Sequence, residues 1–422
     1  MRRLYNIISW LILPFAFMRL YYRGRKAPAY RLRWKERLGY APFELKKCIW
    51  IHAVSLGETI AATPLIKQLQ QRYPNQPILV TNMTPTGSAQ TQKTFSNTVH
   101  NCYLPYDVPS CLKRFLRRVN PAMLIIMETE LWPNLMHYTS QRNIPIILAN
   151  ARLSARSAKG YGKFRKTTAS LLNQFSHIAA QYQADGDRYL ALGLNPEKLV
   201  ITGSIKFDIT PAADLESKAQ TLKNTWGNRP VWIAGSTHES EEEIMLAAHR
   251  TILKQYPTAL LILVPRHPER FATVNTLCNK QGFNTATRSS GELCTPETTL
   301  FLGDTLGDLM LLYATADVAF VGGSFIMLGG HNVLEPAALG KPGLTGPNFF
   351  NFMDITQKLI SAEAVWQVNS ADELAQRVSQ LFGDADLRQR MGQNGLNLVA
   401  QNRGALAKLC QVIDSTYSAT LL

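Results

Sequence analysis

Short apolar runs alternate with longer polar or amphipathic stretches along most of the chain. The runs are rich in Ile, Leu and Val, and segments of helical length separate them, which is typical of buried parallel strands joined by helices. The first series consists of Ile49–Val54, Ile78–Thr81, Cys102–Pro105, Met123–Met127, Ile146–Ala149, Ile178–Ala180 and Val200–Thr202. The second consists of Val231–Ala234, Leu260–Val264, Leu300–Leu302, Val318–Val321 and the strand and turn at Lys341–Pro347. The pattern therefore predicts an α/β fold of two halves, each a parallel sheet with helices on both faces.

A polar helix predicted at Asp214–Thr225 separates the two series and indicates the linker. We therefore expect an N-terminal segment over residues 1–40 and a first α/β domain over 41–210. A second α/β domain is expected over 211–403, and a C-terminal helix over 404–422.

The N-terminal segment has a different pattern. Leu4–Phe17 is apolar and aromatic, and basic side chains flank it. These are Arg2, Arg3, Arg19, Arg23, Arg25 and Lys26. Because about 20 apolar residues are needed to cross a bilayer, the run spans one only if Met18–Tyr22 joins it. We expect a membrane anchor that keeps the body on the cytoplasmic side, since the heavier positive cluster follows the run. A single span, an interfacial helix and a core helix remain open.

Charge and cysteine content restrict the function classes. The 422 residues carry a formal net charge of +15, and residues 1–47 hold 12 Lys and Arg against two Asp and Glu. The excess charge therefore lies in a basic arm, which is suited to anionic lipid and argues against a nucleic-acid binder. The six cysteines include no CxxC pair, which argues against zinc and against a disulfide framework.

Polar residues follow strand ends in the first half, where ligands of parallel α/β sheets lie. Glu58 follows Ser55-Leu56-Gly57 at a predicted helix start. That helix end favours the ionised carboxylate, which could then accept a proton. The alternative is ordinary placement of an acidic residue at a helix N-terminus.

Two further candidates in this half are an acidic pair and a lysine. Glu128 and Glu130 follow Met123–Met127, and we expect them to alternate off the strand end onto one face. The alternative is that one of them pairs with a base such as Arg152. Lys206 follows another strand and could offset charge on a leaving phosphate or a substrate carboxylate. The alternative there is a surface lysine.

The stretch Val318–Pro336 is the strongest candidate in the second half. A short strand leads into Gly322-Gly323 and Gly329-Gly330, and then Asn332 and Glu335 open a predicted helix. Glycine lets the backbone approach a ligand, and a helix N-terminus offers free N–H groups to an anion. Glu335 could bind the two hydroxyls of a ribose. The alternative is that Asn332 is an N-cap and Glu335 completes a capping box.

A second possible anion cradle follows Val231–Ala234, where small residues precede a helix. Its members are Gly235, Ser236 and Thr237. The alternative is a capping box between Ser236 and Glu239. His238 and Glu242 lie four residues apart, but the HExxH zinc pattern is absent, so we predict no metal there. Other strand ends of this half also carry basic or glycine residues, and this convergence favours a nucleotide site.

The set of motifs resembles the bacterial 3-deoxy-D-manno-octulosonic acid (Kdo) transferases, glycosyltransferases of the B type (GT-B). The matching motifs are HAVSLGE (52–58), ETELWPN (128–134), GSIKFD (203–208), AGSTHE (234–239), PRHPER (265–270), DTLGDL (304–309) and GGHNVLEP (329–336). The likeness covers nearly the whole chain. One departure is Asp308, where the family often has glutamate.

The resemblance implies two Rossmann-like domains facing across a cleft, the first binding the acceptor and the second binding CMP-Kdo. It implies an inverting transfer of Kdo to a phosphorylated lipid A precursor, lipid IVA, in lipopolysaccharide core biosynthesis at the cytoplasmic face of the bacterial inner membrane. Glu58 is then the general base, while Glu128 and Lys206 stabilise the transition state. The CMP-binding residues it implies are Pro265, Arg266, Gly307, Asp308, Leu309, Asn332 and Glu335. No cofactor and no obligatory metal are expected.

Two other functions stay open at this stage. One is a nucleotide-sugar epimerase of the same architecture, which would need no lipid acceptor and so leaves the basic anchor without a role. The other is a non-catalytic, membrane-peripheral nucleotide-binding protein.

Overall fold

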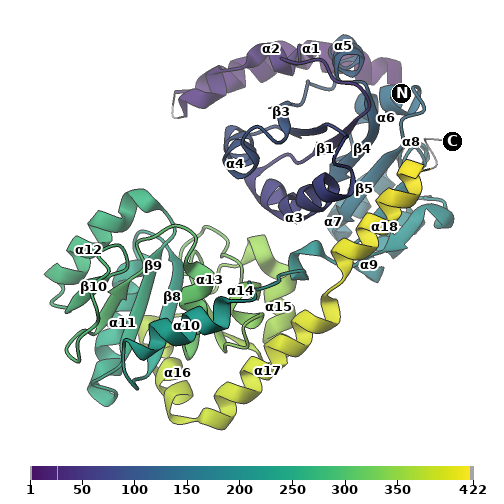
Figure 1. Ribbon diagram of the computed structural model, residues 1–422. Helices are drawn as coiled ribbons and strands as arrows, with labels where there is room; N and C mark the ends of the chain where they lie inside the picture. The colour runs from purple at the N-terminus through teal and green to yellow at the C-terminus, as the bar shows by residue number, and fades with distance from the viewer. Residues whose placement is uncertain (1, 26, 419–422) are drawn as a thin grey trace. The chain divides into compact units, whose positions relative to one another are not determined.

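The computed structural model describes residues 2–25 and 27–418 (Figure 1). Met1, Lys26 and 419–422 lie outside the described residues, so one basic residue of the predicted anchor and the end of the predicted C-terminal helix are not assessed. Contacts divide the chain into two units, Met1–Asp208 with Arg403–Leu422, and Ile209–Asn402.

The first unit is built on a parallel sheet of seven strands in the order β3-β2-β1-β4-β5-β6-β7. The strands are β1 (Cys48–His52), β2 (Ile78–Asn82), β3 (His100–Tyr103), β4 (Pro121–Met127), β5 (Ile146–Ala151), β6 (His177–Ala180) and β7 (Leu199–Ile201). The helices are α1 (Arg2–Arg23), α2 (Trp34–Arg37), α3 (Leu56–Arg72), α4 (Pro85–Phe95), α5 (Pro109–Val119), α6 (Pro133–Ser140), α7 (Ala155–Gly162), α8 (Arg165–Leu172), α9 (Gln183–Ala191) and α18 (Ala405–Ser418), with 3-10 turns η1 (Pro28–Arg31), η2 (Pro196–Lys198) and η3 (Ile205–Phe207).

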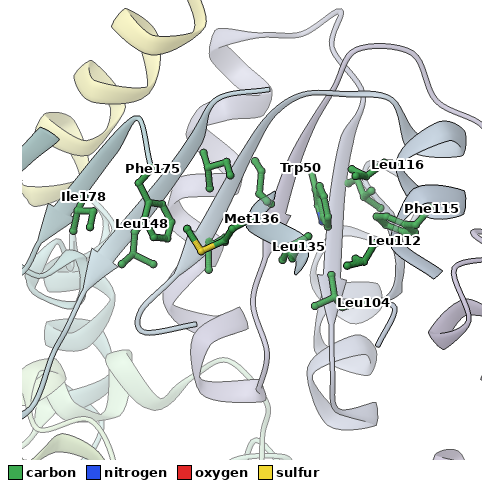
Figure 2. Packing of buried hydrophobic residues seen from close by; sticks show 14 of the residues in the cluster. Trp50, Leu104, Leu112, Phe115, Leu116, Leu135, Met136, Leu148, Phe175 and Ile178 are labelled. Atoms are coloured by element: carbon green, nitrogen blue, oxygen red, sulfur yellow. The ribbon is translucent and has the colours of Figure 1, made fainter. Parts of the chain in front are cut away.

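Both faces of this sheet are covered because its strands are apolar on both sides. Successive side chains of a strand point to opposite faces, so Trp50 and Ile51 enter different cores. Figure 2 shows the core around Trp50, where Phe115 of α5 and Leu135 of α6 pack against the strands. The other core contains Leu65 of α3. This packing of continuous apolar strands between helices matches the sequence pattern.

The C-terminal helix α18 belongs to the first unit although the second unit precedes it in the chain. Leu409 and Ile413 are buried in the core that contains Leu65. Asp208 accepts hydrogen bonds from the Gly404 and Leu406 backbone N–H groups, each at 2.6 Å. An acidic acceptor at a helix N-terminus stabilises unpaired N–H groups, so Asp208 fixes the start of α18.

The second unit repeats the architecture, with seven parallel strands in the order β10-β11-β9-β8-β12-β13-β14. The strands are β8 (Val231–Thr237), β9 (Leu260–Pro265), β10 (Thr285–Thr287), β11 (Leu300–Leu302), β12 (Val318–Val321), β13 (Gly343–Thr345) and β14 (Val365–Gln367). The helices are α10 (Leu215–Asn224), α11 (Glu241–Gln255), α12 (Phe271–Lys280), α13 (Leu309–Thr315), α14 (Leu334–Ala337), α15 (Met353–Ser361), α16 (Ala371–Gly383) and α17 (Ala385–Asn402), with 3-10 turns η4 (Pro268–Arg270) and η5 (Phe350–Phe352). The parallel strands β9, β8 and β12 are neighbours in this sheet. The predicted nucleotide-binding motifs that follow them therefore lie at the same edge of the sheet.

Candidate functional site

Glu58 lies in the first turn of α3, directly beyond β1. Its carboxylate accepts hydrogen bonds from the Val54 backbone N–H at 2.8 Å and from Ser55 Oγ at 3.0 Å. Ser55 Oγ in turn accepts from the Glu58 N–H at 3.4 Å. These contacts are close to those of a capping box, with the Val54 N–H in place of the N-cap N–H, so Glu58 also has the expected alternative role at a helix N-terminus. The two hydrogen bonds hold the Glu58 carboxylate in one orientation. A fixed carboxylate is also suited to catalysis, so the role at the helix end and a catalytic role are compatible.

The pKa of Glu58 differs from the expectation based on the helix end. Burial raises the pKa of this carboxyl to about 7, although the hydrogen bond from Val54 lowers it. The nearby charges of Glu128 and Glu130 also raise it and contribute to this value. Burial and neighbouring acids therefore outweigh the helix N-terminus. A carboxylate whose pKa lies near neutral pH is an effective general base there.

Glu128 and Lys206 form an ion pair between two strand ends. Lys206 Nζ in η3 lies 3.3 Å from Glu128 Oε1, and each side chain is 26% exposed. The expectation that Glu128 and Glu130 alternate off a strand is wrong, because β4 ends at Met127 and a turn follows. Glu128 has a φ of 60°, a left-handed conformation that non-glycine residues rarely adopt. The turn, and not the strand, orients these acids.

Glu130 completes the acidic group of the first unit. Burial raises the pKa of its carboxyl, and the charge of Glu128 raises it further. The Glu128 carboxylate therefore opposes ionisation of both Glu58 and Glu130, which is a way of holding an acid at a useful pKa. The group can accept a proton from an alcohol and can stabilise a developing positive charge, while Lys206 can stabilise a negative one.

In the second unit, buried Glu241 organises the glycine-rich loop after β12. Its carboxylate accepts N–H bonds from Gly323 at 2.7 Å, and from Ser324 and Phe325 at 2.9 Å each. It also accepts from the His238 N–H at 3.1 Å. One carboxylate thus joins the loop after β8 to the loop after β12. Sequence reasoning missed it, and the only available signal was its place in the first turn of a predicted helix.

A pair of imidazoles lies beside this loop. His238 Nε2 is 2.8 Å from His331 Nε2, and the two ring planes are nearly parallel, with an interplanar angle of 7°. Burial, together with nearby positive groups including Arg266, lowers the pKa of His238 to about 4 and that of His331 to about 3. Both rings are therefore neutral at pH 7, and one donates its N–H to the other. Sequence reasoning missed this pair because 93 positions separate its members.

Asn332 and Glu335 lie next to this pair, joined by their side chains. Asn332 Nδ2 donates to Glu335 Oε1 at 3.3 Å, and Asn332 Oδ1 accepts from the Leu334 N–H at 3.2 Å. The helix α14 starts at Leu334, two positions after the predicted start, since Asn332 bonds across the turn. Burial raises the pKa of Glu335, and the charge of Arg266 lowers it. Arg266 therefore acts on both Glu335 and the imidazole pair.

The possible cradle Gly235–Thr237 does not precede a helix as expected. These residues continue β8, with an irregularity in pairing between Gly235 and Thr237 and a φ of 58° at Ser236. The Gly235 carbonyl accepts from the Gly322 N–H at 2.8 Å. A Cβ at Gly235 would lie 2.2 Å from the Tyr313 hydroxyl oxygen, so only glycine fits. The predicted Ser236–Glu239 capping box is wrong, because α11 begins at Glu241.

The remaining predicted nucleotide ligands lie at two neighbouring strand ends. Pro265 ends β9, and the Arg266 N–H donates to the Thr237 carbonyl at 2.9 Å. The others, Gly307, Asp308 and Leu309, lie at the start of α13.

Asp308 is held in a separate hydrogen-bond group at the start of α13. Its Oδ2 accepts from Arg288 Nε at 3.0 Å and from Thr305 Oγ1 at 2.8 Å. Although burial favours the neutral acid, these two contacts lower the pKa of Asp308. Its carboxylate is thus already engaged, so a contact to a nucleotide at this turn would come from the backbone. Within the described part of the chain, no group of three or more His, Cys, Asp and Glu is arranged to hold a metal ion.

Comparisons with known sequences show the family of this chain. A family model described as 3-deoxy-D-manno-octulosonic-acid transferase (kdotransferase) matches residues 32–209. The chain is 47% identical over 393 residues to the 3-deoxy-D-manno-octulosonic acid transferase of Haemophilus influenzae, covering 92% of each protein. It is 34% identical to that of Bordetella pertussis, over 98% of this chain and 99% of the relative. A solved glycosyltransferase from Rickettsia africae is 14% identical with a TM-score of 0.54, covering 89% of this chain and 99% of that one, a likeness of fold alone.

Proposed function

The chain belongs to the 3-deoxy-D-manno-octulosonic acid (Kdo) transferase family of glycosyltransferases, and from that premise we propose that it transfers Kdo from CMP-Kdo to a phosphorylated lipid A precursor, lipid IVA. Its α/β fold has two Rossmann-like units of the GT-B class. The observation that carries this assignment is the sequence identity to two named transferases, in alignments that cover nearly the whole chain. The first unit would bind the acceptor and the second would bind CMP-Kdo.

In this proposal Glu58 takes the proton from the acceptor hydroxyl as that oxygen attacks the anomeric carbon. The raised pKa of about 7 supports this role, because the carboxylate is then strong enough to accept a proton and is still substantially ionised at neutral pH. Inversion at the anomeric carbon follows from a single displacement on the face opposite CMP. Glu128 would stabilise the oxocarbenium-like state, and Lys206 would balance negative charge nearby.

CMP would bind in the second unit at the ends of β9 and β12. Arg266 carries the positive charge for the phosphate, and Asn332 with Glu335 supplies an amide and a carboxylate for the ribose. The backbone of Gly307–Leu309 offers further contacts. The neutral pair of His238 and His331 adds a hydrogen-bond donor beside Arg266 without adding charge. Glu241 joins the loop that carries His238 to the glycine-rich loop that leads to His331 and Asn332, which supports a preformed site.

The basic N-terminal segment would hold the enzyme at the cytoplasmic face of the inner membrane, where its lipid acceptor lies. Helix α1 is, by length and composition, able to cross a membrane. Incubation of the purified chain with radiolabelled CMP-Kdo and lipid IVA tests the activity. Labelled lipid supports the transferase, whereas release of free sugar alone or unchanged donor supports an epimerase or a non-catalytic binder. Mass spectrometry of the lipid then counts the Kdo residues added.

A further inference from the structure

Helix α1 lies against the first unit along one regular stripe. Its less exposed residues recur every three or four positions, as one face of a helix requires. They are Tyr5, Asn6, Ser9, Leu13, Ala16, Phe17, Leu20 and, just beyond the helix, Gly24. Tyr5 Oη donates to Asp107 Oδ2 at 2.8 Å. The Phe17 ring centre lies 5.2 Å from that of Trp34 and 5.5 Å from that of Tyr106. Both ends of the stripe therefore make specific contacts with the body.

The opposite face of α1 is apolar and open to solvent. At 100° per residue it is centred about half a turn from the docked stripe. Its members are Leu4, Ile7, Ile8, Leu11, Phe15 and Met18. Leu4, Leu11 and Phe15 are 62%, 65% and 64% exposed. A continuous, solvent-exposed apolar face of this kind marks a site of contact with a membrane or with another protein. Arg3 and Arg19 lie on either side of it, outside its apolar centre.

The surroundings of α1 favour an anionic lipid as the occupant. The Arg2 guanidinium contacts the His137 ring of α6, and the His137 ring centre lies 5.0 Å from that of Tyr138. Tyr138 lines a surface cavity of about 540 Å³ between α5 and α6. The basic residues of that lining are Lys113, Arg114, Arg117 and Arg142. Positive charge next to an exposed apolar helix face is the signature of binding to anionic bilayers.

We propose that α1 is an in-plane membrane helix, which rests on the first unit through its Tyr5 face and inserts its Leu11 face into the interface of an anionic bilayer without crossing it. A spanning α1 would have to leave the body, because a helix of this length extends about 30 Å along the bilayer normal. Tyr5 would then lose Asp107, and Phe17 would lose Trp34 and Tyr106. The contacts thus distinguish two topologies that length and composition leave open.

The docking contact also reaches the acidic turn. Asp107 is 7% exposed, and its carboxylate accepts from the Asn134 and Leu135 N–H groups at 3.0 and 2.7 Å. These N–H groups begin α6, which follows Glu128 and Glu130 in the chain. Asp107 therefore connects the membrane helix to the segment that carries the acidic pair. An in-plane α1 stays part of the domain that holds Glu58, whereas a spanning helix would be only a tether.

A topology experiment tests this inference independently of transferase activity. The full chain, with Cys294→Ser to remove the one cysteine that is not buried, carries Arg2→Cys and His137→Cys. In intact spheroplasts we expect no reaction of position 2 with a membrane-impermeant maleimide added outside, and reaction after permeabilisation. A short bismaleimide should link positions 2 and 137 in membranes, detected by peptide mass spectrometry. Labelling from outside, or absence of the link, would overturn the in-plane topology.

Vesicle flotation tests the occupant of the exposed face. The wild-type chain should float with phosphatidylglycerol-containing vesicles, and Leu11→Glu with Phe15→Glu should remain at the bottom of the gradient. Leu293→Glu, which alters an equally exposed leucine of the second unit, is the matched control and should float. Wild-type chain that stays unbound, or that instead forms dimers through this face in light scattering, would contradict a lipid partner.

Discussion

Lys206 Nζ lies 3.3 Å from Glu128 Oε1 and thereby joins η3, which follows β7, to the turn after β4. Both side chains are partly exposed, so solvent screens the pair and its contribution to folding is small, about 0–1 kcal/mol. A left-handed backbone at Glu128 accompanies the contact. The ion pair contributes too little to stability to explain why Glu128 keeps a strained backbone conformation. A role of Glu128 and Lys206 in the proposed reaction explains it better.

Replacement of Lys206 by Ala should therefore separate activity from stability. We expect kcat to fall by about 10²–10³ because charge stabilisation in the transition state is lost. The melting temperature should change little. The matched control is Lys218→Ala, which breaks an ion pair with Asp214 on the exposed surface of α10 and should leave kcat unchanged. A Lys206→Ala enzyme with normal kcat would remove this residue from the mechanism.

The pH dependence of kcat/KM should report the ionisation of Glu58. The base must be ionised, and burial raises its pKa to about 7, so kcat/KM should rise with pH below about 7 and level off above it. Glu130→Gln removes one neighbouring negative charge and should move this rise to lower pH. A profile that is flat between pH 5 and 8, or a Glu130→Gln profile moved to higher pH, would contradict the assignment.

Stability should change with pH in a direction set by the same group. The folded-state pKa of Glu58 lies above its ordinary value of 4.5, so protonation of this carboxyl favours the folded state. That contribution is complete below pH 4.5 and is lost as pH rises through about 7. Glu58→Gln cannot ionise, so its free energy of unfolding, compared with wild type in urea titrations, should be relatively higher at pH 8 than at pH 5. An equal difference at both pH values would argue against the raised pKa.

Glu241 should be essential for the conformation of the glycine-rich loop at the proposed nucleotide site. Glu241→Gln replaces one of the two carboxylate oxygens with an amide donor, which then faces either the N–H groups of Ser324 and Phe325 or that of Gly323. We expect destabilisation of at least about 2 kcal/mol and a higher KM for CMP-Kdo, because the glycine-rich loop loses one of its two acceptor oxygens and the negative charge on it. Glu243→Gln changes an exposed carboxylate of the same helix and serves as the control. Unchanged stability and KM in Glu241→Gln would refute this role.

Glu335 should contribute to CMP binding and less to the chemical step. Glu335→Gln should weaken CMP binding about tenfold, the effect of one lost hydrogen bond to a charged group, as measured by titration calorimetry. Glu292→Gln, an exposed carboxylate of the same unit, should bind CMP normally. Equal affinities for the two variants would place the ribose elsewhere.

The sequence predicted the central strands well because their residues are apolar on both faces. It missed the edge strands β10 and β14, which are three residues long and contain polar side chains such as Thr285 and Gln367. It also ended β8 at Ala234, since Gly235-Ser236-Thr237 has the composition of a loop. Only the pairing of these residues with β9 shows that the strand continues.

The local position of a candidate residue was predictable where one short motif contains it, as for Glu58 at the start of α3 and for Asn332 with Glu335 near the start of α14. It was not predictable where contacts join distant segments. Glu241 bonds to N–H groups more than 80 positions away, and His331 meets His238 across 93 positions. The pKa of Glu58 likewise depends on Glu128 and Glu130, which the fold, and not the local sequence, brings near it.

The most direct measurement of the central claim is transfer of labelled Kdo to lipid IVA by Glu58→Gln. We expect its turnover to fall by about 10²–10⁴, the usual contribution of a general base, while its affinity for CMP-Kdo is retained. Glu197→Gln, an exposed acid in the first turn of η2, should transfer at the wild-type rate. A Glu58→Gln enzyme with nearly full turnover would show that another group accepts the proton.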